Sequence, residues 1–142
     1  MKRMKFIAAL IAGIGVVAAL PAHAEKVLKY THFQPGKTDQ PKHAAAVAFK
    51  EHVEKATNGS IKVELYPAGQ LGPAQQVMEG LRLGTIELGV VHDGGMAGVY
   101  KNINIFGLPF IFDDHAHAYR VLEGEFGKSF AEDMRKKTGI RL

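Results

Sequence analysis

The chain has 142 residues, with 18 basic side chains, 14 acidic side chains and no cysteine. This length suits one domain with its own hydrophobic core, and the lack of cysteine excludes a disulfide-stapled scaffold. Three of the basic residues lie within the first five positions, so the rest of the chain is nearly neutral. It lacks the basic stripe that nucleic-acid binding requires, and we expect no nucleic-acid partner.

The start of the chain has the parts of a cleavable export signal. A basic beginning precedes the uncharged run 6–20, and the small residues Ala22 and Ala24 predict cleavage before Glu25. A membrane anchor is disfavoured, because a spanning helix needs about 20 apolar residues and this run is shorter. The sequence thus predicts a signal peptide over 1–24, a mature domain over 25–142, a periplasmic location and no stable membrane insertion after the leader is removed.

The first half of the mature chain alternates between strand and helix patterns. β-forming residues predict a strand over 27–33, and strict alternation predicts a second strand over 61–65. Between them, Asp39 is expected to cap a helix that has Pro41 in its first turn and ends at Asn58. The helical spacing places Ala45, Phe49, Val53 and Ala56 on the inward face, and Lys50, Glu51, Glu54 and Lys55 on the outward face.

The alternation continues with a second helix and a third strand. The helix is predicted over 73–83 and is closed by Gly84. The run 86–91 is almost continuously apolar, which favours a strand at the centre of the sheet, ended by Gly94 and Gly95. The inward residues of the helix are expected to be Val77, Met78 and Leu81.

The last third of the chain is predicted to be helical. Asp113 or Asp114 is expected to cap a helix that runs to about Leu122, and a second helix is expected over 125–137. Residues 140–142 have the character of a fourth strand that has just begun. We therefore expect this chain to be the front part of a longer protein.

The order strand, helix, strand, helix, strand predicts an α/β fold with a parallel sheet, right-handed crossovers and flanking helices. In such sheets ligands bind beyond the carboxyl ends of the strands, which points to the loops 32–34, 69–72 and 92–94. The helix that opens at Pro73 has no capping side chain and no acid in its first turn. Its N–H groups therefore meet either an anion or only water.

The histidines and acids do not form a metal or catalytic set. His115 and His117 point to different faces of a helix, and His43 and His52 lack a third ligand, so we expect no metal. Nucleophile-elbow, phosphate-loop and cysteine-nucleophile signatures are absent from the sequence. The acids at 113–114 suit a helix cap better than acid–base catalysis. The sequence predicts neither an enzyme nor a cofactor.

Five short segments form a specific ordered pattern: LKY (28–30), TNGSIKV (57–63), YPAGQLG (66–72), LGTIEL (83–88) and LPFIF (108–112). In this order they resemble the solute-binding proteins of TRAP (tripartite ATP-independent periplasmic) transporters, the DctP-like family. The resemblance spans essentially all of residues 25–142, and the ordered set is far more specific than any one segment.

The resemblance implies the first of two α/β lobes that close over a small organic acid, such as a C4-dicarboxylate. It also implies delivery of that acid to the membrane subunits of the transporter, for uptake driven by an ion gradient. Family members usually hold the ligand carboxylate with an arginine of the second lobe, which we expect beyond residue 142. Arg141 does not match the motif of that arginine. Nothing in the matching residues identifies the acid.

By position, the first-lobe contacts of the family fall at Phe33 or Gln34 and at His92. Relatives can have an acidic or polar residue where this chain has His92, and a structural histidine and a ligand contact are equally favoured there. The ligand-binding residues expected from the three loops are Phe33, Gln34, Gln70, His92 and Asp93. Two other functions stay open on the same scaffold: a sensory ligand-binding protein that signals to a receptor and, with less support, an exported α/β enzyme.

Overall fold

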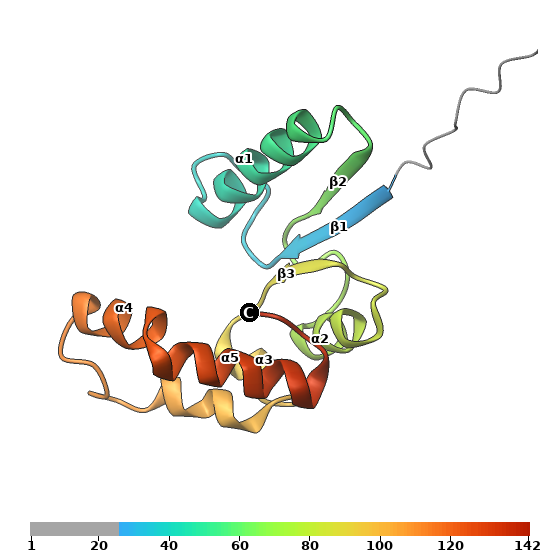
Figure 1. The fold of residues 1–142 in the computed structure, drawn as a ribbon. Helices are drawn as coiled ribbons and strands as arrows, with labels where there is room; N and C mark the ends of the chain where they lie inside the picture. The colour runs from blue at the N-terminus through green and yellow to red at the C-terminus, as the bar shows by residue number, and fades with distance from the viewer. Residues whose placement is uncertain (1–25) are drawn as a thin grey trace, which may run out of the picture.

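The computed structural model describes residues 26–142, so the predicted signal peptide and its removal lie outside the described residues and stay predictions. The α/β fold is confirmed, with strands and helices alternating through the first half of the chain (Figure 1). The elements are β1 (Lys26–His32), α1 (Pro41–Ala56), β2 (Ile61–Tyr66), α2 (Ala74–Leu83), β3 (Leu88–Val90), α3 (Asp93–Met96), the 3-10 helix η1 (Lys101–Gly107), α4 (His115–Glu123) and α5 (Glu125–Thr138).

The three strands form a parallel sheet in the order β2-β1-β3. Tyr30 of β1 lies opposite Leu65 on one side and opposite Leu88 on the other. Figure 1 shows α1 on one side of the sheet and α2 on the other, as right-handed crossovers to opposite sides of β1 require.

The prediction that the third strand lies at the sheet centre is wrong for the described part of the chain, where β1 is central. β3 has only three residues, and its Gly89 is exposed. The apolar character of 86–91 has another cause. Ile86 packs against α2, where a Cβ at Gly80 would lie 2.7 Å from its Cδ1 atom.

Helix α1 begins differently from the prediction. Its N-cap residue is Gln40 and not Asp39, and the Gln40 side chain makes no capping hydrogen bond. Pro41 occupies the first turn as expected. The side chain of Gln34, in the preceding loop, supplies the missing cap.

The inward face of α1 is also rotated from the predicted one. Ala46 is its buried residue, whereas Phe49, expected inside, is 38% exposed. Lys50 and Glu54, expected outside, bind the edge of β2. The Lys50 ammonium donates to the Val63 carbonyl at 2.8 Å, and the Val63 N–H donates to Glu54 Oε1 at 3.0 Å. Neither backbone group is paired within the sheet, so without the Lys50–Glu54 pair both would have to form hydrogen bonds with water.

A hydrophobic core joins the helices below the sheet. Met134 of α5 is fully buried and packs with Met78 of α2 and with residues of α3 and η1. The Tyr100 hydroxyl donates to Asp133 at 2.6 Å, which adds a polar link from η1 to α5. The members of this core are Met78, Met96, Tyr100, Ile103 and Met134.

The two C-terminal helices follow the prediction closely. The Asp114 carboxylate accepts the His117 N–H at 2.6 Å and so caps α4, and Gly139 ends α5 with a φ of 78°. Helix α4 buries none of its residues and contacts α5. Residues 140–142 have no regular secondary structure, so the expected fourth strand is not formed in this chain.

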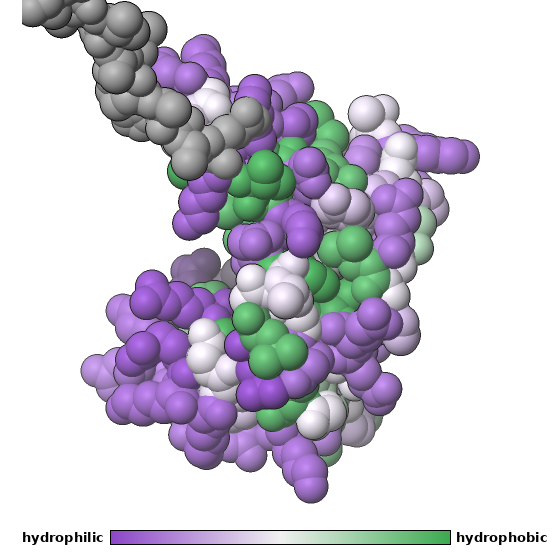
Figure 2. Space-filling view, turned by 90° about the vertical axis from the view of Figure 1, so that its right-hand side faces the viewer, coloured by the Kyte–Doolittle hydropathy of each residue, from purple (hydrophilic) through white to green (hydrophobic). Residues whose placement is uncertain are grey.

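On the face shown in Figure 2, apolar groups form separate patches among hydrophilic side chains.

The helix core predicts that Met134 is a major stabilising residue. Met134→Ala should lower the free energy of unfolding by about 2–5 kcal/mol, because it removes buried contacts and leaves a cavity. Met134→Leu, which nearly conserves volume, should cost less than about 1.5 kcal/mol. Urea denaturation of the two variants measures both values, and equal losses would contradict a close-packed core at this position.

Candidate functional site

Three loops meet at the carboxyl ends of the strands, with Phe33 in the middle. The centroid of the Phe33 ring lies 6.3 Å from that of His92, a residue that follows β3, and the two rings pack edge to face. It also packs on Gly69 of the loop after β2, where an added Cβ would lie 3.2 Å from the ring. Gly69 has a φ of 69°, so this position requires glycine both for its backbone and for the close approach. The structure thus brings together the three loops that the sequence pointed to.

Main-chain hydrogen bonds fix the first two of these loops to each other. The Gly69 N–H donates to the His32 carbonyl at 3.1 Å, and the Ala68 N–H donates to the Gln34 carbonyl at 2.9 Å. The later donor bonds the earlier acceptor, so the two bonds join the loops without extending the parallel pairing of β1 and β2. The chain on either side of Phe33 is therefore joined by main-chain hydrogen bonds to the loop after β2.

His92 is the N-cap of α3. Its Nδ1 accepts the Gly95 N–H at 3.0 Å, while its backbone is extended. Gly94 and Gly95, expected to end the strand, are therefore the first-turn residues of a short helix that packs on the start of α2. A neutral imidazole that accepts at Nδ1 carries its proton on Nε2. His92 is an exposed residue, so its Nε2–H is a hydrogen-bond donor at the surface of the site.

The other expected residues have different surroundings. The Gln34 side-chain oxygen accepts the Lys42 N–H at 2.9 Å and so caps α1. Gln70 is exposed and lies next to Gly69 in the loop after β2. Asp93 opens α3, and its Oδ2 lies 3.4 Å from the Cβ position of Gly107, so this carboxylate lies beside η1.

The start of α2 agrees with the sequence analysis. Pro73 is its N-cap, the first turn contains no acid, and no side chain within the described residues caps it. Gly72, with a φ of 105°, lies against the side chain of Gln76 in that first turn. The positive end of the helix dipole is therefore not offset by a carboxylate of its own first turn.

A histidine pair next to the site, with one member buried, was not predicted from the sequence. His32, the last residue of β1, is fully buried, and its Nε2 lies 3.0 Å from Nδ1 of His43 in α1. Its own Nδ1 has no hydrogen-bond partner among residues 26–142. Burial lowers the pKa of His32, and the neighbouring His43 and Lys42 lower it further. The two histidines are 11 positions apart, and only the tertiary fold brings them together.

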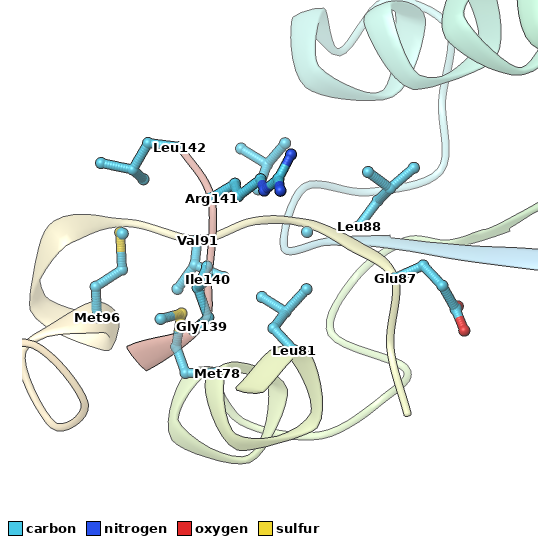
Figure 3. A pocket seen from close by; sticks show the side chains of 12 residues that line it. Met78, Leu81, Glu87, Leu88, Val91, Met96, Gly139, Ile140, Arg141 and Leu142 are labelled. Carbon is cyan, nitrogen blue, oxygen red and sulfur yellow. The ribbon is translucent and has the colours of Figure 1, made fainter. Parts of the chain in front are cut away.

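A hollow lies elsewhere, along the outer edge of β3. It has a volume of about 570 Å³ and is bounded by Met78 and Leu81 of α2, by Met96 and by the last residues of the chain (Figure 3). Its lining does not include Phe33, Gln70 or His92. Functional groups converge at the strand ends, so we place the candidate site there and not in this hollow.

Comparison with known proteins gives consistent matches. The family described as "Bacterial extracellular solute-binding protein, family 7" (DctP) matches residues 32–142. The C4-dicarboxylate-binding periplasmic protein DctP of Rhodobacter capsulatus is 34% identical over 132 residues, which are 89% of this chain and 39% of that protein. The 2,3-diketo-L-gulonate-binding periplasmic protein YiaO of Escherichia coli is 32% identical over 78% of this chain and 33% of its own length.

The fold has the same relatives among solved structures. A TRAP periplasmic solute-binding protein of Sulfurospirillum deleyianum with bound succinate matches with a TM-score of 0.72 and 32% identity, over 80% of this chain and 36% of that one. This chain thus spans about two fifths or less of the length of the relatives it matches. These relatives are solute-binding proteins and not enzymes. Within residues 26–142, no helix is both long and apolar enough to cross a membrane.

The buried His32 predicts an acid-sensitive fold. Because its pKa is lower in the folded chain, the unfolded chain binds more protons as the pH falls below 6.5, the ordinary pKa of histidine. This contribution to stability is therefore complete above that pH and is lost as the pH falls. Glu132, whose pKa Arg135 lowers from 4.5 to about 2, makes the fold acid-sensitive only at lower pH, because its carboxyl stays ionised near pH 6 even in the unfolded chain.

Urea denaturation between about pH 7.5 and about pH 5.5 measures this effect. The midpoint should fall with pH in the wild type, and the slope should flatten in His32→Gln. His52→Gln, which changes an exposed histidine of α1, should keep the wild-type slope. A slope that is the same in His32→Gln and in the wild type would show that another group causes the acid sensitivity.

Proposed function

The chain belongs to family 7 of the bacterial extracellular solute-binding proteins, and from this premise we propose that it captures a small organic acid in the periplasm for a TRAP transporter. Delivery to the membrane subunits of that transporter, with uptake driven by an ion gradient, is part of the proposal. The observation that carries it is the meeting of Phe33, Gly69 and His92 at the strand ends. This is where parallel α/β sheets bind ligands.

The ligand class follows from the groups at this edge. His92 offers an Nε2–H, the first turn of α2 offers backbone N–H groups, and Phe33 offers an apolar ring. Donors of this kind select oxygen acceptors such as carboxylate, hydroxyl and keto groups. Similar proteins are described with bound succinate, β-D-galacturonate and L-gulonate, which are all rich in such oxygens.

Of the five residues expected from the sequence, we propose that Phe33, Gln70 and His92 face the ligand. Gln34 and Asp93 already have other neighbours, the start of α1 and η1 respectively. The proposed contacts include no cationic side chain. A charged anchor for the carboxylate is therefore expected from the part of the protein that corresponds to the remaining length of the relatives.

Calorimetry on the full-length protein tests this function. Succinate, D-galacturonate and L-gulonate are titrated in turn, with D-galactose as a control that has the ring and hydroxyls of galacturonate but no carboxylate. The proposal predicts saturable binding of at least one acid and no binding of galactose. Failure of every acid, or equal binding of galactose and galacturonate, would contradict capture of an organic acid.

A pair of variants separates the two roles of His92. Asn and Asp both cap helices well, so His92→Asn and His92→Asp should fold with similar melting temperatures. Asn keeps an N–H donor for the ligand, whereas Asp offers only acceptors and a negative charge. The acid should therefore bind at least about tenfold more weakly to His92→Asp than to His92→Asn. Equal affinities in the calorimeter would make His92 a structural cap only.

A further inference from the structure

We propose that Gln34 is a positioning residue, whose side chain caps α1 and thereby holds Phe33 in place at the binding edge. This inference rests on the proposed function where it concerns the ligand. It assigns the Gln34 side chain to the start of α1, whereas its position after β1 had indicated a contact with the ligand.

The start of α1 has a backbone N–H without a partner inside the helix, and the Gln34 side chain accepts its hydrogen bond. The N-cap residue Gln40 makes no side-chain cap, and Pro41 has no N–H to satisfy. The first N–H of the helix that needs a partner belongs to Lys42, and it donates to Gln34 Oε1 at 2.9 Å. The cap thus comes from a residue eight positions before the donor, across the loop between β1 and α1.

The main chain of Gln34 binds a different element from its side chain, the loop after β2. Its carbonyl accepts the Ala68 N–H at 2.9 Å, next to the bond between Gly69 and His32. Gln34 therefore links α1 to the loop after β2, with its side chain on one element and its backbone on the other. Phe33 directly precedes it and packs on Gly69 and His92, so the direction of the Phe33 ring depends on this link.

The chemistry of the cap distinguishes it from a ligand contact. The bond to Lys42 uses only the side-chain oxygen of Gln34. Glutamate has the same length and two acceptor oxygens, and a negative charge is favourable at a helix N-terminus. A Gln34 that donated its amide N–H to an organic acid would instead become repulsive when changed to glutamate.

Three variants of the full-length protein test the proposal: Gln34→Ala, Gln34→Glu and Gln40→Ala. The last is a matched control, since Gln40 is a neighbouring glutamine without a capping bond. Amide hydrogen exchange is followed at Lys42 and at Ala68, and calorimetry measures the affinity for the acid that the wild type binds.

Gln34→Ala should speed exchange at Lys42 by roughly two- to thirtyfold, the range expected for the loss of a helix cap. It should also weaken acid binding by roughly three- to tenfold. Gln34→Glu should restore both values to near wild type, and Gln40→Ala should change neither. If the Gln34 amide N–H were needed to bind the acid, glutamate would not restore the affinity.

Two results would overturn the proposal. Unchanged exchange at Lys42 in Gln34→Ala would show that the cap contributes nothing. Normal exchange in Gln34→Glu with binding as weak as in Gln34→Ala would show that Gln34 contacts the ligand. A wild type that binds no acid would instead refute the proposed function, and exchange at Lys42 and Ala68 would still decide whether Gln34 joins the two elements.

Discussion

The parallel pairing of β1 with β2 on one side and β3 on the other is the constraint on which the rest of the structure depends. Because all three strands run in the same direction, the residues that follow them meet at one edge of the sheet. Tyr30, paired with both Leu65 and Leu88, sets this register near the end of β1. Residues from three distant parts of the sequence, Phe33, Gly69 and His92, become neighbours as a result.

The edge so formed is polar but nearly free of charge. His92 is committed to capping α3 through Nδ1, which leaves Nε2–H to face outward. His32, below the edge, is buried and has a lowered pKa, so it is neutral at neutral pH. For an anionic ligand such a surface supplies orientation through hydrogen bonds, and none of the three proposed contacts carries a positive charge.

Several patterns of local origin were predicted correctly from the sequence, whereas most side-chain contacts between distant elements were not. The alternation at 61–65, the Asp114 cap and the Gly139 helix end each depend on a few neighbouring residues, and each was confirmed.

Other features depend on what the tertiary fold places alongside a residue. Lys50 and Glu54 turn inward because the edge of β2 offers unpaired backbone groups. Asp39 does not cap α1 because Gln34 takes that role across a loop. The three site loops were predicted from topology alone, but the roles of Gln34 and His92 as caps follow only from the tertiary structure.

The most direct test of His92 as a ligand contact is the nitrogen NMR spectrum of its imidazole in the full-length protein, recorded with and without the bound acid. We expect a neutral ring protonated at Nε2 and a change in the Nε2 signal when the acid binds. A ring protonated at Nδ1, or a signal that the acid leaves unchanged, would contradict this role.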